Sequence, residues 1–134
     1  MPASIASRAA AYLLIAEGVA VATLTIMEAR KLFAGEATSL TTALALIALT
    51  LVGTVALFAF GIAVLRGGSW GRSGGIVLQL LGLGLVLSAL SLRPLPITFM
   101  LAIGVPAAIT LVLLLAAVRA SGRPSGEDHL DGEA

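Results

Sequence analysis

The sequence predicts an all-α membrane protein with four transmembrane helices in an up-down bundle. Of the 134 residues, 59% are hydrophobic and 11% are charged, whereas soluble domains carry roughly 45–50% apolar and about 25% charged residues. The chain also contains four apolar runs close to the ~20 residues that a helix needs to cross a ~30 Å hydrocarbon core. Leucine-rich runs such as 111–115 do not alternate with polar residues, as the strands of a transmembrane barrel would.

The expected spans, which together form one domain over residues 1–118, are 9–29, 39–65, 75–92 and 97–118. The first run contains Glu17 and exceeds the ~7–15 apolar residues of a signal peptide, so an uncleaved span is expected. The second is longer than a bilayer requires and is expected to tilt or project. The third ends before Pro94 and Pro96, which cannot continue a helix. The fourth contains Pro106, which membrane helices tolerate.

A polar connection at residues 65–75, LRGGSWGRSGG, separates the second and third spans. We expect a tight cytoplasmic connection in which Gly67, Gly68, Gly74 and Gly75 are turn residues. Arg66, Trp70 and Arg72 are expected to be interfacial anchors, because tryptophan and arginine beside a span lie at the membrane surface. Contact with anionic lipid is the alternative, but two arginines fall short of the four to eight basic residues of a polybasic site.

The arginines and lysines predict the orientation. Five of them, Arg8, Arg66, Arg72, Arg119 and Arg123, lie on the side of the termini, and three, Arg30, Lys31 and Arg93, lie on the other. The positive-inside rule therefore favours both termini in the cytoplasm. The expected location is the plasma (inner) membrane. Residues 119–134 contain four acids and too little apolar area to fold, so we expect a disordered acidic cytoplasmic tail there.

Three polar side chains are predicted to lie inside the membrane: Glu17, Gln79 and Thr54. Measured from the expected span ends, Glu17 is about 12 Å deep and Gln79 about 6 Å deep. A carboxylate in a span costs on the order of 2.5–3.5 kcal/mol, which makes Glu17 a functional candidate. Two interpretations stay open: a protonated glutamate bonded to another helix, and a proton- or cation-linked role. Gln79 is expected to hold helices together by bonding to Glu17 or Thr54.

Several kinds of function are disfavoured. The net charge of +1 provides no basic surface for nucleic acid. The absence of cysteine and the single histidine disfavour a metal site, and no cofactor is expected. We find no phosphate-binding, hydrolase or metalloprotease motif and expect no enzymatic activity. The expected partners are the lipid bilayer and either other membrane-protein subunits or further copies of this chain.

The stretch 63–90 resembles a functionally uncharacterised family of small four-span integral membrane proteins common in actinobacteria. Arg66, Trp70, Arg72 and Gln79 match that family's arginine-rich "LRGRRWGR" connection and the glutamine that follows it. This resemblance implies the architecture and no activity. The pair Ala16 and Glu17 resembles small multidrug resistance transporters, four-span proteins with an essential glutamate in span one. The third span here lacks their aromatic residues, and the long tail is unlike theirs.

Two functional hypotheses follow. The first is a non-enzymatic accessory subunit or scaffold of a larger membrane assembly, favoured because the sequence contains no catalytic constellation. The alternative is a small proton-coupled transporter of the multidrug-resistance type that uses Glu17 as its coupling acid. The surroundings of Glu17 distinguish them: a dry contact with Gln79 or Thr54 favours the subunit, and an aqueous cavity favours the transporter.

Overall fold

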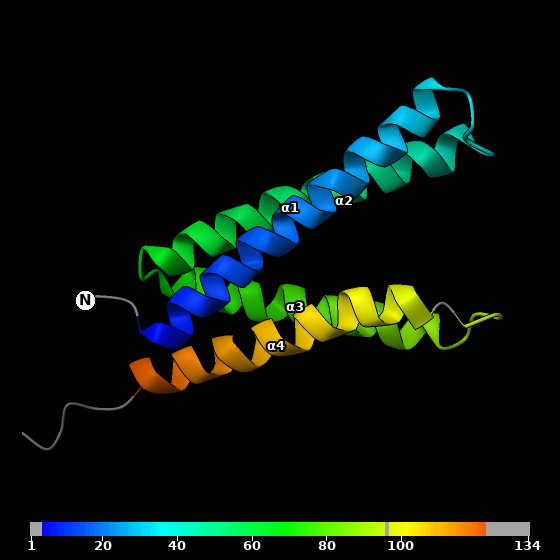
Figure 1. Cartoon of the computed structure of the whole chain (residues 1–134). Helices are drawn as coiled ribbons and strands as arrows, with labels where there is room; N and C mark the ends of the chain where they lie inside the picture. The colour runs from blue at the N-terminus through cyan, green and yellow to red at the C-terminus, as the bar shows by residue number, and fades with distance from the viewer. Residues whose placement is uncertain (1–3, 96, 123–134) are drawn as a thin grey trace, which may run out of the picture.

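The computed structural model describes residues 4–95 and 97–122, which form four α-helices and no strand (Figure 1). The helices are α1 (Ile5–Phe33), α2 (Leu40–Leu65), α3 (Ser69–Ala89) and α4 (Ile97–Ser121). Each contains a stretch long and apolar enough to cross a membrane. The predicted all-α fold with four membrane-spanning helices is therefore confirmed, and the chain is a multi-pass membrane protein.

Short polar residues and glycines set the helix ends. Ser4 and Ser39 precede α1 and α2, and their hydroxyl oxygens accept hydrogen bonds from the backbone N–H groups three residues later. This capping satisfies donors that a helix start would otherwise leave free. Gly35 after α1 and Gly67 after α2 have φ values of 73° and 78°, which glycine adopts without the steric cost of a Cβ. The chain therefore reverses abruptly after each helix.

The connection between α2 and α3 is shorter than the expected 65–75. It contains only residues 66–68, because Gly67 makes the reversal and Gly68 N–H donates to the Ala63 carbonyl at 2.8 Å. Trp70 and Arg72 therefore lie in the first turns of α3. Gly71 is a packing residue, since an added Cβ would lie 2.6 Å from the Ala63 Cβ. Gly74 and Gly75 also lie within α3, so the expectation that they are turn residues is wrong.

The four helices form two antiparallel hairpins that lie together at one end and diverge at the other (Figure 1). The hairpins are α1 with α2 and α3 with α4. We call the end where they meet the closed end; it contains the start of α1, residues 66–68 and the end of α4. The open end contains the connections that follow Phe33 and Ala89.

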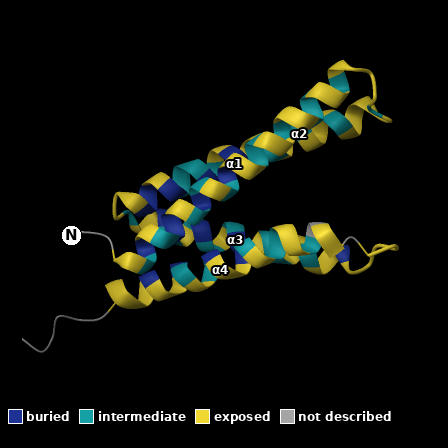
Figure 2. Ribbon diagram, in the orientation of Figure 1, coloured by how far each residue is buried: buried dark blue, intermediate teal, exposed yellow. Residues whose placement is uncertain are grey.

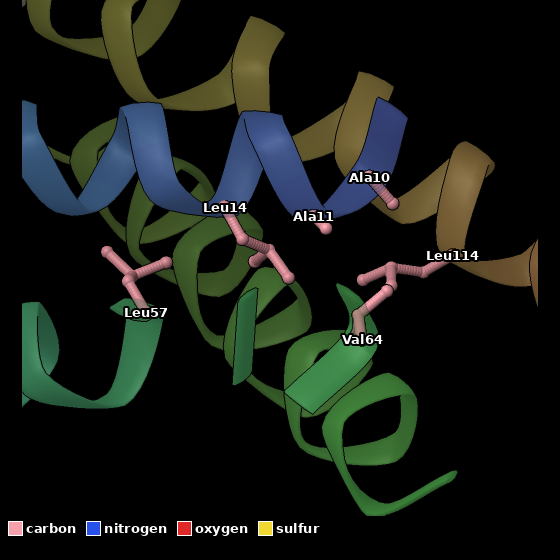
Figure 3. Close-up of a cluster of buried hydrophobic side chains, with 6 residues drawn as sticks. All are labelled: Ala10, Ala11, Leu14, Leu57, Val64 and Leu114. Carbon is pink, nitrogen blue, oxygen red and sulfur yellow. The ribbon is translucent and has the colours of Figure 1, made fainter. Parts of the chain in front are cut away.

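Buried side chains gather in the half of the molecule nearest the closed end (Figure 2). A hydrophobic cluster there, drawn in Figure 3, consists of Ala10, Ala11, Leu14, Leu57, Val64 and Leu114. These residues come from α1, α2 and α4. Helix α3 approaches through Gly75, where an added Cβ would lie 3.0 Å from Leu114 and 3.3 Å from Leu14. Helices in lipid associate by such close packing, because lipid tails are as apolar as the side chains they replace.

The C-terminal part of the chain is helical for longer than expected. Helix α4 continues to Ser121, whose hydroxyl donates to the Ala117 carbonyl at 2.8 Å. The first residues of the expected tail, 119–121, thus belong to the helix. The remainder of that prediction falls on residues 123–134, which lie outside the described residues.

Candidate functional site

The candidate site is a polar link that joins the two hairpins through Glu17. The Gln79 amide nitrogen Nε2 donates to Glu17 Oε2 at 2.6 Å. The Thr110 hydroxyl Oγ1 lies 2.7 Å from Glu17 Oε1, at hydrogen-bonding distance. Both oxygens of the α1 carboxyl are therefore engaged, one by α3 and the other by α4. Within the described residues, these are the hydrogen bonds that connect side chains of different helices.

All three residues lie close to the middle of their helices. Glu17 is twelve residues from the start of α1, Gln79 ten residues from the start of α3 and Thr110 eleven residues before the end of α4. At a rise of 1.5 Å per residue, these separations are about 15–18 Å from the closed end. Glu17 and Gln79 are thus farther from the helix starts than the 12 and 6 Å measured from the expected span ends, because α1 and α3 begin earlier than the expected spans.

Glu17 has neutral partners, and both partners are buried. Gln79 is 3% exposed, Thr110 is 0% exposed and Glu17 is half-buried. The ion pair found among the described residues is elsewhere, between Lys31 and Glu28 at 3.0 Å. A polar group without a partner is costly in an apolar surrounding. The Gln79 amide and the Thr110 hydroxyl therefore satisfy the Glu17 carboxyl by hydrogen bonding and supply no opposite charge.

The polar link lies at the level beyond which α1 and α4, within the described part of the chain, contribute no buried residue toward the open end. Helix α1 has no buried residue between Gly18 and its end, and α4 has none before Ala107 among those whose burial is described. The contact at Glu17 is therefore part of the last well-packed layer before the open half. Chemically, such a carboxyl can fix the two hairpins to each other, or it can gain and lose a proton at the point where they part.

Thr54, the third intramembrane candidate, does not join the link. Its side chain is buried on α2, but its hydroxyl donates to the Thr50 carbonyl of the same helix at 2.8 Å. Thr110 is the threonine that bonds to Glu17, whereas the sequence pointed to Thr54 as the partner in this contact. The available signal was its isolation, since no other side chain between positions 99 and 118 has a hydrogen-bonding oxygen or nitrogen.

The three candidate anchors lie at the closed end. Arg66 is exposed directly after α2, and Arg72 is half-buried near the start of α3. Trp70 is 60% exposed and contacts Phe60 edge-on, with ring centroids 5.9 Å apart. A position at one end of the bundle suits interfacial side chains, and the anchor role remains a prediction.

Fold and site together define a multi-pass membrane protein whose two helical hairpins are joined at mid-depth by one carboxyl. No family model, curated protein or solved structure matches the chain. The resemblances to the actinobacterial four-span family and to small multidrug resistance transporters therefore stay predictions from the sequence.

Proposed function

We propose that the protein is a non-enzymatic accessory subunit or scaffold of a larger assembly in the plasma (inner) membrane, with both termini in the cytoplasm. The observation that supports this role most is the engagement of both Glu17 oxygens by Gln79 and Thr110. A carboxyl with these two bonds has a structural role, because it holds the α1–α2 hairpin against the α3–α4 hairpin. Such a contact is the kind that the subunit hypothesis expects around Glu17.

The surface beyond the polar link also supports this role. Gly84 lies on α3 in the diverging half, and a Cβ added there would have no neighbour within 4 Å. Ser88, one helical turn further on, is exposed, and its hydroxyl donates to the Gly84 carbonyl of its own helix. Small residues spaced by four permit close approach of another helix. We expect a helix of a partner subunit to use this face.

Two substitutions of Glu17 test the proposal. In Glu17→Gln, the amide oxygen can accept from Gln79 and the amide nitrogen can donate to Thr110, so stability and assembly should be nearly unchanged. In Glu17→Ala, the buried Gln79 amide loses its partner, and the free energy of unfolding should fall by about 1–3 kcal/mol. Thermal unfolding in detergent, measured beside cell growth, provides the comparison. A Glu17→Gln variant that is stable but inactive would count against a purely structural role.

Purification in mild detergent tests the assembly itself. The full-length protein, tagged and expressed at its natural level, should be recovered with at least one other membrane protein in a stoichiometric amount. Glu17→Ala should lose that partner, and Glu17→Gln should keep it. Recovery of the chain alone, under conditions that preserve other membrane complexes of the same cells, would contradict the proposal.

The alternative function is a small proton-coupled transporter with Glu17 as the coupling acid. The observation that favours it is the exposure of the three linked residues: Gln79 and Thr110 are buried, whereas Glu17 is only half-buried at the level where the hairpins part. A carboxyl in that position can exchange a proton with water that enters between the hairpins. On this alternative, Glu17→Gln abolishes transport as completely as Glu17→Ala, because an amide cannot release a proton.

A further inference from the structure

The fold brings four arginines from distant parts of the sequence to the closed end. They are Arg8, Arg66, Arg72 and Arg119, one from each helix end that meets there. Arg8 and Arg66 are each two residues from a member of the hydrophobic cluster, Ala10 and Val64 respectively. We call these four residues the arginine cluster.

The other two members are held by the same packing. Arg72 precedes Gly75 by three residues, and Arg119 follows Leu114 by five. Gly75 lies against Leu114, which is part of the hydrophobic cluster drawn in Figure 3. All four arginines are therefore within about 8 Å of that packed layer along the helix axes. From the sequence, lipid contact is an alternative for Arg66 and Arg72 alone, and the assembled helices add Arg8 and Arg119 at the same end.

Charge is distributed unevenly between the two ends. The acids among the described residues are Glu17 at mid-depth, and Glu28 and Glu36 at the open end. The open end, with three basic residues and these two acids, has a net charge of +1, whereas the described closed end has +4. In the part of the chain that the structure describes, the guanidinium groups of the arginine cluster form no ion pair. Each guanidinium group has five N–H donors with which it can bind an anionic ligand.

An exposed aromatic residue lies next to these charges. Trp70 falls between Arg66 and Arg72 in the sequence and is 60% exposed at the start of α3. Tryptophan is typical of the level at which lipid head groups meet the hydrocarbon. The arginine cluster is thus expected to lie at the depth of phosphate groups rather than in bulk water.

We propose that the arginine cluster binds the head groups of anionic phospholipids in the leaflet at the closed end. Four basic residues reach the size of a polybasic lipid site, which two did not. Guanidinium groups suit this ligand because they can donate two parallel hydrogen bonds to one phosphate. The binding is independent of whether the protein is a subunit or a transporter, since it requires only that the closed end lies at the membrane surface.

The single tryptophan makes the site directly measurable. Full-length protein is reconstituted in phosphatidylcholine vesicles that contain either brominated phosphatidylglycerol or brominated phosphatidylcholine, and quenching of Trp70 fluorescence is compared. The expected result is a relative binding constant that favours phosphatidylglycerol by at least about fivefold, the equivalent of one basic residue near an anionic surface. Added salt should reduce this preference, because it screens exposed charges. Equal quenching by the two lipids would overturn the proposal.

A matched pair of double variants assigns the effect to the cluster. The first double variant, Arg8→Gln with Arg119→Gln, removes two members of the arginine cluster that are distant from Trp70 in the sequence. It should lower the preference for phosphatidylglycerol at least about fivefold. The second double variant, Arg30→Gln with Lys31→Gln, makes the same change of charge at the open end. It should leave the preference for phosphatidylglycerol unchanged. Equal losses in both variants would show that net charge, and not the cluster, attracts the lipid.

The acidic segment 123–134 provides a second control, because it contains four carboxylates and follows Arg119 closely. The full-length chain should already prefer phosphatidylglycerol. A preference that emerges only after truncation at Gly122 would mean that these carboxylates, and not lipid, occupy the arginine cluster, and it would overturn the proposal for the intact protein.

Discussion

At the scale of single residues, the molecule shows two ways of satisfying a hydroxyl group inside a membrane. Thr110 bonds to Glu17 on another helix, whereas Thr54 bonds to the carbonyl one turn earlier on its own helix. Both side chains are buried. A bond within a helix satisfies the hydroxyl without linking elements, and a bond between helices adds to the stability of the bundle.

This difference predicts unequal effects for two nearly isosteric substitutions. Thr110→Val removes a donor from Glu17 and should lower the free energy of unfolding by about 0.6–1.7 kcal/mol. Thr54→Val is the matched control and should change it by less, because the Thr50 carbonyl keeps its backbone partner. Thermal unfolding of both variants in one detergent measures the difference. Equal destabilisation would mean that the polar link contributes no more than ordinary packing at these positions.

The same comparison shows what the sequence reveals about the site. The bond between Gln79 and Glu17 could be anticipated, because both have long polar side chains in apolar runs and need partners. For Thr110 the sequence offered only its isolation in the fourth span. That signal is weak, since Thr23, Thr25 and Thr54 all satisfy their hydroxyls on their own helices. The sequence alone therefore does not tell whether the hydroxyl of a threonine in a span bonds within its own helix or to another helix.

At the scale of elements, the ends of the helices were harder to predict than their existence. Long apolar runs identify a span, but helical geometry continues through polar and glycine-containing segments when a neighbouring helix packs against them. The start of α3 is the main example, because Gly74 and Gly75 were expected to be turn residues but lie within the helix, in close contact with other helices. Close packing is a tertiary property that a local glycine pattern does not specify.

Substitution of two glycines in α3 tests this interpretation. In Gly71→Ala, the new Cβ would lie 2.8 Å from the Val64 backbone nitrogen, which cannot move without distorting α2. We expect a loss of about 1–3 kcal/mol, the usual cost of overpacking. Gly84→Ala is the control, since nothing lies within 4 Å of the added atom, and it should be neutral or stabilising by up to about 1 kcal/mol. Detergent stability of the two variants provides the measurement, and a neutral Gly71→Ala would contradict the packing role.

At the scale of the whole molecule, the divergence of the hairpins has no counterpart in the sequence pattern. In a soluble helix, a polar face and an apolar face reveal which side is buried. Here the lipid-facing and the buried sides are both apolar, so the runs that identify the spans do not orient them. Leu14 is fully buried and Leu49 is 70% exposed, although both are leucines within a span. The polar link shows which faces of α1, α3 and α4 point inward, and the arginine cluster distinguishes the two ends of the bundle. Hydropathy alone indicates neither.

The last prediction concerns the orientation of the bundle in the bilayer. The closed end has four described arginines with no acid, so retention of this end in the cytoplasm should be favoured over translocation. The chain has no cysteine, which allows a single introduced cysteine to be labelled without background. Ala34 and Ser69 are exposed positions at opposite ends, and Ala34 avoids the strained φ that a cysteine would adopt at Gly35. In intact cells, a membrane-impermeant maleimide should label Ala34→Cys and spare Ser69→Cys, whereas permeabilised cells should show labelling of both. The opposite pattern in intact cells would place the arginine cluster on the outer face and reverse the proposed orientation.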